Sequence, residues 1–408
     1  MANSETDVDE VPDLGLCLSG GGFRAAFYSL GALRYLAESG RLGQLKVVSA
    51  VSGGSIAAAM MADRWTAFQD AGGGLDAFLE TIDRPFRRVV TEKNLRNAWL
   101  RRALLHPFAG RGAALGRTLA EHLYEHERVS DLPALPQVIF TSTDLGAGRA
   151  FRIARDFVGS YDHDYVEPAW PSLELGTSVA ASAAFPGSLS VVSLKTEGVG
   201  LPKAPPVLSL VDGGIYDNLG LEWFQGWNAT RPGSAIRPGF SIVVDASGQL
   251  ARTDKRFGSL QSVFRDLSIQ YAQTLNLRVR WLIDTLLTQP HAVGFRGAYV
   301  GIRHDPRAYK DVDGRGVDPA FYAGAMPSAL VQPLALLRTD LDRFLPEEAD
   351  LLSYHAYWSL HARLKTVAPD FALDTPAWQP TEYAQMPDVE TKRFANLLDR
   401  GAKRVLDR

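Results

Sequence analysis

The sequence predicts an α/β fold: a three-layer α/β/α arrangement with a mostly parallel central sheet, a helical insertion and C-terminal helices. Two apolar runs of strand length, at residues 14–19 and 45–51, are each followed by glycines and then by a helical pattern. This repeated succession of strand, turn and helix is typical of a parallel sheet covered by helices. With 408 residues and 46% hydrophobic composition, the chain can also bury a large core. Further apolar runs of strand length lie at residues 137–145, 206–213, 241–247 and 297–305.

Apolar residues spaced three and four apart predict the helices. In the first helix, at residues 23–40, Phe23, Phe27 and Leu30 recur at this spacing, and Gly40 is suited to end it. A small-residue helix at 172–187 is expected to end near Pro186, because proline cannot continue a helix. The other expected helices begin near Gly53, span 256–287 and 345–364, and begin near Pro387.

The simplest domain organisation is one α/β domain at residues 13–365, with a helical insertion at about 64–130. Residues 1–12 form an acidic tail. Residues 366–408 form a C-terminal extension that we expect to pack on the same domain. The sequence contains no internal repeat and no long low-complexity linker.

Charge and cysteine content narrow the class of protein. The formal net charge is −3, so nothing favours a nucleic-acid polymer as partner. Cys17 is the only cysteine, which suits a reducing compartment, and its context predicts an inert thiol in a buried strand. No apolar run approaches the roughly 20 residues of a membrane-spanning helix, and no secretory signal is visible. We therefore expect a cytoplasmic protein whose membrane contact, if any, is peripheral, at the inner membrane surface.

The stretch AVSGGS, residues 50–55, places Ser52 where a strand must turn sharply into a helix. Small neighbours, Ala50 and Gly54, permit such an elbow, which presents the serine hydroxyl above the sheet edge. The N-terminus of the following helix favours a developing negative charge there. The usual elbow pattern is Gly-x-Ser-x-Gly, and Ala50 replaces its first glycine. From this stretch alone, Ser52 is either a nucleophile or part of an ordinary turn.

A second glycine-rich turn follows the first strand, in LSGGGFRA at residues 18–25. The consecutive glycines Gly20, Gly21 and Gly22 allow backbone N–H groups to converge on one point, as in an oxyanion hole or a phosphate cradle. The turn has neither the Rossmann spacing nor the lysine of a phosphate-binding loop, so nucleotide binding is not favoured. Both turns should lie at the carboxyl edge of the sheet.

A base for Ser52 is expected at the end of another strand. Of the eight histidines, His304 alone comes near the end of an apolar strand. Asp212 ends the apolar run before Gly213 and Gly214, and these glycines would let a partner approach closely. The alternative for this stretch is an ordinary Asp-Gly turn.

Three motifs together resemble the patatin-like phospholipase family, which is related to cytosolic phospholipase A2. SGGGFRA resembles its glycine-rich oxyanion motif with the following basic residue, Arg24. AVSGGS resembles its nucleophile motif, and DGGIYDN resembles its Asp-Gly-Gly motif with Asn218 downstream. The resemblance spans about residues 13–365 in the family's order. Its further segments are TSTDLGAGRAFRI (141–153), SVAASAAFPG (178–187) and the helical region 337–364.

The resemblance implies a serine lipid acyl hydrolase that uses a Ser–Asp dyad without histidine. Ser52 would be the nucleophile and Asp212 the base, and water would hydrolyse the acyl-enzyme. No metal or other cofactor is implied, and the sequence shows no cluster of metal ligands. The oxyanion hole would consist of Gly20, Gly21 and Gly22, and the supporting residues would be Arg24, Gly54, Gly213, Gly214 and Asn218.

Several alternatives for substrate and regulation stay open at this point. The expected substrate is a phospholipid or another lipid ester. A thioesterase or carboxylesterase would use the same dyad, and some bacterial relatives are effectors gated by a small-molecule activator such as a cyclic nucleotide. A non-catalytic binding module would need neither Ser52 nor Asp212. Arg24 is expected near the mouth of the site, where it orients an anionic head group or the loop, or else forms an ion pair on the helix surface.

The segment from Arg84 to Arg117 is strongly basic. It carries nine arginine and lysine residues but only one acidic residue, Glu92, and Trp99 and several leucines are interleaved with them. Such a segment can lie on anionic lipid, form a lid, or bind an anionic regulator. It can also be a helical insertion whose arginines pair with acidic groups elsewhere in the chain.

Overall fold

The computed structural model describes residues 13–403 except 107–109, 168–172, 186–189, 198–199, 225–235, 249, 251–253, 255, 288–295, 312 and 379–382. Its centre is a ten-stranded mixed sheet in which five neighbouring strands, in the order β10-β9-β1-β2-β3, run parallel. The expected α/β fold with a mostly parallel central sheet is therefore confirmed. The parallel strands are β1 (Leu14–Leu18), β2 (Leu45–Val51), β3 (Gln137–Asp144), β9 (Phe240–Asp245) and β10 (Gly297–Gly301).

The other half of the sheet is antiparallel. β3 pairs with β4 and β8, β4 continues to β5 and β6, and β7 pairs with β8. Of these strands, only β8 was expected as an apolar run, and β4 only within the family resemblance. β5 and β6 have three residues each, too short for a periodic signal. The bounds are β4 (Arg149–Ala154), β5 (Val158–Ser160), β6 (Asp164–Val166), β7 (Val192–Lys195) and β8 (Val207–Asp212).

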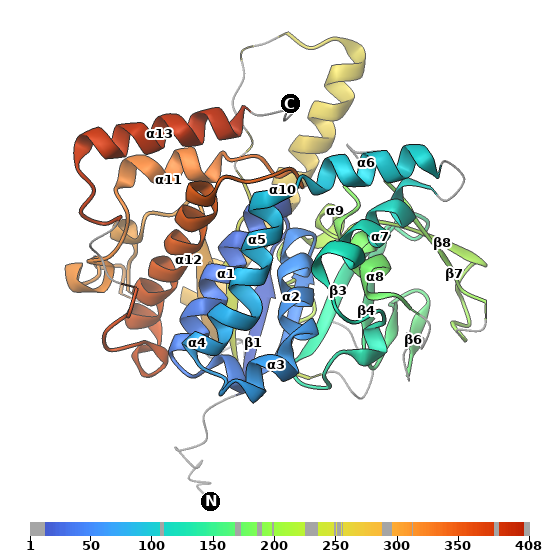
Figure 1. Ribbon diagram of the computed structural model, residues 1–408, viewed down its shortest axis with the longest axis horizontal. Coiled ribbons are helices and arrows are strands. Elements are labelled where there is room, and N and C mark those ends of the chain that lie inside the picture. Colours follow the sequence, from blue (N-terminus) through green and yellow to red (C-terminus); the bar gives the residue numbers. More distant parts are fainter. Residues whose placement is uncertain are drawn as a thin grey trace, which may run out of the picture.

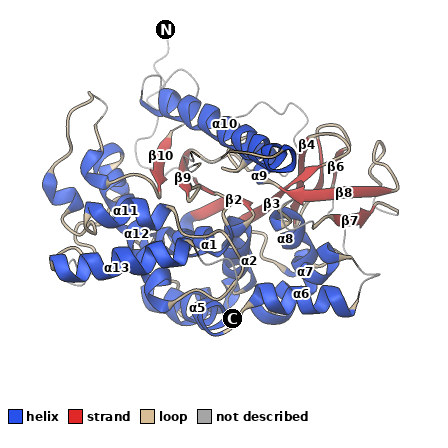
Figure 2. Ribbon diagram, turned by 90° about the horizontal axis from the view of Figure 1, so that it is seen from above, coloured by secondary structure: helices blue, strands red, loops and turns tan. Residues whose placement is uncertain are grey.

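Successive side chains of the central strands point to opposite faces of the sheet, so the core forms two layers. In β1, Leu14, Leu16 and Leu18 pack into the main core, whereas Cys17 packs into a smaller cluster with Leu282 on the opposite face. Figure 2 shows α10 and α9 on this second face, and α1, α2 and α12 on the first. Burial of Cys17 in a strand is confirmed. These helices are α1 (Gly22–Glu38), α2 (Gly53–Asp63), α9 (Gly214–Asp217), α10 (Ser259–Leu287) and α12 (Pro346–Val367).

The helical predictions are largely correct. The first helix ends at Glu38, and Gly40 follows with φ of +68°. The small-residue helix is α8 (Leu175–Ala183), and its expected end at Pro186 lies outside the described residues. The region 64–130 is helical throughout its main elements: α3 (Trp65–Asp70), α4 (Leu75–Phe78), the π-helical turn η2 (Leu79–Asp83), α5 (Arg84–Glu92), α6 (Leu95–Leu105), α7 (Arg111–Leu123) and η4 (Val129–Asp131).

The C-terminal part folds back on the α/β core. Gly31 of α1 lies so close to α12 that a Cβ there would collide with the Ser353 carbonyl, and Ser353 Oγ donates to Phe27 O at 2.9 Å. α13 in turn packs on α11. The remaining elements are η1 (Leu42–Gln44), η6 (Pro306–Ala308), η7 (Pro319–Tyr322), α11 (Ser328–Ala335), η8 (Pro369–Phe371) and α13 (Asp388–Ala402).

The orientation of the sheet can be followed in Figure 1. α2 begins at the upper end, directly after β2, and leads down to α3 at the lower end. The carboxyl edge of the parallel strands is therefore the upper end of the molecule. α6 and α10 both lie at this end. Among the residues that the structure describes, no helix is long and apolar enough to cross a membrane.

Candidate active site

Ser52 forms the turn between β2 and α2. Its backbone has φ 51° and ψ −117°, a conformation that a non-glycine residue adopts only when its surroundings impose it. The Ser52 carbonyl accepts the Ile56 N–H at 3.1 Å, the first turn of α2. The residue is buried, and the N-terminus of α2 is directed at it. This is the geometry expected of a nucleophile elbow.

The hydroxyl group of Ser182, in α8, holds this elbow in place through hydrogen bonds. It donates to the Thr141 carbonyl of β3 at 2.6 Å, so it acts as acceptor toward its other two partners. These are the Ser52 N–H at 3.0 Å and the Ser55 hydroxyl at 2.8 Å. One buried hydroxyl therefore joins α8, β3 and the start of α2.

The glycines after Ser52 are required by a close approach between the two turns. A Cβ on Gly53 would collide with the Gly22 carbonyl, and a Cβ on Gly54 would collide with the Leu18 carbonyl. The Gly54 N–H donates to Ser19 O at 3.1 Å. The absence of side chains at these positions thus lets α2 begin against the β1–α1 turn.

The glycine turn after β1 presents backbone donors beside Ser52. Gly21 and Gly22 have φ of +139° and +55°, which favours glycine at both positions. A Cβ on Gly20 would lie 3.1 Å from the Ser52 Cβ. The Gly20 N–H is already used, because it donates to Asn218 O at 3.0 Å. Within the described residues, the Gly21 and Gly22 N–H groups donate to no acceptor.

Asp212 lies at the end of β8 and is buried. Burial raises the pKa of its carboxyl group from 3.8 to about 6, against the opposing effects of hydrogen bonds with the Ser52 side chain and with Gly214 N–H. The Gly214 N–H bond, to Oδ1, measures 2.7 Å. Thr143 Oγ1 donates to the Asp212 carbonyl at 2.9 Å and holds the strand end against β3. These contacts place the Asp212 carboxyl group next to the Ser52 side chain.

Asn218 connects the glycine turn with the Asp212 turn. A Cβ on Gly20 or on Gly214 would collide with Asn218 Oδ1, so the Asn218 side chain fits only because both residues are glycines. Its Nδ2 donates to Ser247 Oγ at 2.7 Å, beyond the end of β9. A Cβ on Gly213 would collide with the Thr141 carbonyl. Gly20, Gly214 and Asn218 therefore bring together the ends of β1, β8 and β9.

Arg24 is buried, so the expected alternative of an ion pair on the helix surface is wrong. Its Nη1 donates to Ala335 O at 3.0 Å and to Leu337 O at 2.7 Å. Burial lowers the pKa of Arg24 to about 10, against the influence of Tyr271 and Asp245. The first turn of α1 is thus tied to the end of α11 and to the segment that follows it.

Tyr271 brings α10 to the same site, which the sequence did not predict. Its Cε2 would lie 3.1 Å from a Cβ on Gly214. Burial and then the charge of Asp212 raise the pKa of the Tyr271 phenol, so the hydroxyl stays protonated. α10 therefore closes the second face of the sheet beside Asp212.

The structure gathers Ser52, Asp212, Asn218 and the glycines of both turns at one edge of the sheet. Strand-end reasoning accounts for the two glycine turns, which follow parallel strands. β8 is antiparallel to β3, and Asp212 reaches this edge because it pairs with Ser142 near the carboxyl end of β3. Ser182, Thr143 and Tyr271 were missed. Of these three, only Ser182 could have been suspected from the sequence, because it is a polar residue with alanines on both sides in the small-residue helix 172–187. Nothing in the sequence separates Tyr271 from the other apolar positions of α10.

A family model described as patatin-like phospholipase matches residues 16–223, about half of the chain. The chain belongs to the patatin-like phospholipase family. Members of this family are carboxylic ester hydrolases. The matched range of this patatin-like protein contains the glycine turn, the Ser52 elbow and Asp212.

The fold is also similar to solved structures. Human GIVD cytosolic phospholipase A2 matches 91% of this chain and 61% of its own, with a TM-score of 0.53 and 13% identity. At this identity the likeness concerns the fold, and the patatin-like chain spans about 61% of that phospholipase. The complex of the human enzyme with methyl γ-linolenyl fluorophosphonate has a TM-score of 0.48 at 14% identity, over 98% and 60% of the two chains. VipD from Legionella pneumophila has a TM-score of 0.29 at 14% identity, over 96% and 85%. No curated protein matches the sequence.

Proposed function

We propose that this patatin-like protein is a serine lipid acyl hydrolase that releases fatty acyl chains from phospholipids through Ser52 and Asp212. The observation that carries the proposal is that the strained Ser52 elbow and the buried Asp212 carboxylate, whose pKa is raised to about 6, lie on either side of Asn218 at the same edge of the sheet. A carboxylate of this pKa is a better base than an exposed one and is still ionised at neutral pH.

In the proposed acylation step, Asp212 takes the Ser52 hydroxyl proton while Oγ attacks the ester carbonyl carbon. The carbonyl oxygen becomes an oxyanion next to the Gly21 and Gly22 N–H groups and the N-terminus of α2. One such donor typically contributes on the order of 3 kcal/mol to transition-state stabilisation. The alkoxide of the leaving lysolipid then receives the proton from Asp212, and the acyl chain stays on Ser52.

Deacylation reverses these roles. Asp212 accepts a proton from water, the hydroxide attacks the acyl carbonyl, and the bond to Ser52 Oγ breaks as Oγ takes the proton back. Fatty acid leaves and the free serine is regenerated. Each proton passes through Asp212, and no histidine is needed.

The test measures fatty-acid release from mixed phospholipid vesicles and hydrolysis of a soluble p-nitrophenyl ester. We expect the wild type to be active, and Ser52→Ala and Asp212→Asn to lose at least about 10³-fold in kcat. Ser39→Ala is the matched control, because its hydroxyl bonds only the Leu36 carbonyl at the end of α1. A fluorophosphonate should label the Ser52 peptide of the wild type and not that of Ser52→Ala.

The two substrates separate the alternatives. Hydrolysis of the soluble ester without release from vesicles would favour a carboxylesterase or thioesterase. Activity that begins only when a cyclic nucleotide is added would favour the ligand-gated effector. Full activity of Ser52→Ala would overturn the dyad.

A further inference from the structure

Helix α6 exposes an apolar ridge at the carboxyl edge of the sheet. Leu104 and Leu105 are 81% and 74% exposed, and Leu100 is 41% exposed. Arg101 is also exposed and lies among them on the same side of the helix. We call Leu100, Arg101, Leu104 and Leu105 the α6 ridge. Isolated exposed leucines are common on soluble proteins, but three on the same side of two successive helix turns form a patch.

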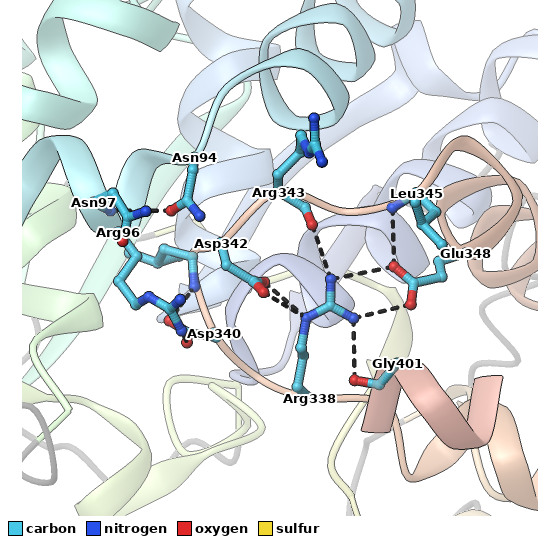
Figure 3. Close-up of polar contacts among 11 residues, drawn as sticks. Asn94, Arg96, Asn97, Arg338, Asp340, Asp342, Arg343, Leu345, Glu348 and Gly401 are labelled. Carbon is cyan, nitrogen blue, oxygen red and sulfur yellow. Dashed lines mark hydrogen bonds and ion pairs between the residues drawn. The ribbon is translucent and has the colours of Figure 1, made fainter. Parts of the chain in front are cut away.

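The ridge is not a frayed end of the fold, because the opposite face of α6 is firmly packed. Leu95 and Trp99 are buried, and Trp99 Nε1 donates to Arg111 O at 2.9 Å. The Arg96 N–H donates to Leu341 O at 2.9 Å. The Arg96 side chain also pairs with Asp340, as Figure 3 shows. The leucines are therefore held outward by the packing of their neighbours.

The charges of the basic segment 84–117, which contains the ridge, are only partly neutralised. Of the nine basic residues at 84–117, four have acidic partners: Arg84 with Glu80, Arg87 with Asp83 and Asp350, Arg96 with Asp340, and Arg102 with Glu121. For these four arginines, the structure agrees with the alternative that they form ion pairs with acidic groups of the chain. The exposed cations that have no acidic partner among the described residues are Arg88, Lys93, Arg101 and Arg117.

The position of the ridge relates it to the site. α6 lies at the end of the molecule where α2 begins (Figure 1). α10 lies at the same end on the other side of the sheet (Figure 2). Val263 and Ile269 of α10 are also exposed. α6 and α10 therefore both carry exposed apolar residues.

We propose that the α6 ridge docks on the surface of an anionic phospholipid bilayer. The leucines would enter the boundary between head groups and acyl chains, and Arg101 and the neighbouring cations would face the anionic head groups. The surface fits a bilayer because exposed apolar side chains lie next to Arg101, an exposed cation without an acidic partner among the described residues. The choice of bilayer rests on the proposed lipid substrate, but docking itself needs no catalysis.

The test measures binding in the Ser52→Ala protein, so that hydrolysis does not alter the vesicles. The probes are sedimented vesicles of phosphatidylcholine alone and of phosphatidylcholine with phosphatidylglycerol in equal parts. We expect binding to the anionic vesicles, a loss of about tenfold or more with Leu104→Asn plus Leu105→Asn, and a loss of about fivefold with Arg101→Gln. Val389→Asn is the matched control, because Val389 is 80% exposed on α13, and it should bind like the parent.

The outcomes separate this inference from the proposed function. Equal binding of the double leucine variant and the parent, or binding to neither kind of vesicle, would overturn docking, whatever the wild type does to a soluble ester. Loss with Arg101→Gln but not with the leucine variant would indicate a soluble anion as the partner and would also overturn it. Ridge-dependent binding in a protein without esterase activity would retain docking and reject the hydrolase. Thermal unfolding verifies that each variant is folded.

Discussion

Among single residues, Asp212 combines burial with a proposed role, acceptance of the Ser52 proton, that requires a charged carboxylate. Burial raises the pKa of its carboxyl group to about 6, and only the ionised form can take the Ser52 proton. We therefore expect kcat/KM for a neutral soluble ester to fall about tenfold per pH unit below about pH 6 and to level off above it. A pH–rate profile between pH 4.5 and 8.5 measures this. A midpoint above pH 7, or a profile without a midpoint, would argue against Asp212 as the base.

Ser182 carries the second prediction at this scale. Ser182→Ala removes the acceptor of the Ser52 N–H and leaves that buried donor unpaired, which costs about 1–3 kcal/mol. We expect a lower midpoint of urea unfolding and a loss of roughly tenfold or more in kcat. Ser178→Ala is the matched control in the same helix, because the Ser178 hydroxyl bonds only the Glu174 carbonyl. Equal effects of both variants would show that Ser182 has no particular role at the elbow.

The candidate dyad could be predicted from the sequence because each residue sits at a strand end with its own local pattern. Ser52 and Asp212 follow apolar runs and precede glycines. Ser182 and Tyr271 have no such pattern, since they act through partners far away in the chain. The Ser182 bond to Ser52 joins residues 130 positions apart. The burial of Arg24 was missed for the same reason, because its acceptors at Ala335 and Leu337 belong to a distant segment.

Among the elements, the starts of α1 and α2 touch through backbone alone. A Cβ on Gly53 would collide with Gly22 O, and the collision cannot be relieved by a side-chain movement because the atoms it meets are backbone atoms. We expect Gly53→Ala to lower the free energy of unfolding by about 1–3 kcal/mol and to abolish activity, because it separates the Ser52 elbow from the glycine turn. Thermal or urea unfolding and the soluble ester assay measure both effects.

Gly43→Ala is the control for this prediction. Gly43 lies in η1, between α1 and β2, and a Cβ there would meet nothing within 4 Å. Its effect on the free energy of unfolding should stay within about 0.5 kcal/mol. If Gly53→Ala were as stable and active as Gly43→Ala, the two turns would not depend on each other.

The long elements were predictable and the short ones were not. α10 and α12 have many turns of consistent apolar spacing, and β1, β2 and β9 are buried on both faces, so each has a strong signal. β7 has four residues that alternate between buried and exposed, and it is ordered by pairing with β8. Strands of this kind form because of a neighbour, and their own residues do not specify them.

In the whole molecule, Arg338 joins segments that are far apart in the chain. It donates to Asp342 at 2.8 Å, to Glu348 at the start of α12 at 2.9 Å, and to Gly401 O at the end of α13 at 3.2 Å. Figure 3 shows these bonds converging on one guanidinium, which is buried together with both carboxylates. The C-terminal extension is in this way connected to the body of the protein.

Arg338→Gln should therefore destabilise the protein by about 3–5 kcal/mol, because it leaves two buried carboxylates without their cation. The midpoint of urea unfolding measures this. Arg315→Gln serves as the control, since Arg315 pairs with Asp313 in an exposed position and should contribute less than about 1 kcal/mol. A small effect of Arg338→Gln would mean that α13 is held by its apolar contacts alone.

The segment after α11 supports the glycine turn with main-chain atoms. The carbonyls of Ala335 and Leu337 accept from Arg24, the Asp340 carbonyl accepts from the Phe23 N–H at 3.3 Å, and the Thr339 carbonyl occupies the space beside Gly22. The Thr339 side chain itself points to solvent. Exchange of the Thr339 side chain should therefore leave the turn undisturbed, whereas insertion or deletion of one residue would move every carbonyl. The length of this segment is thus under as much constraint as the buried side chain of Arg338.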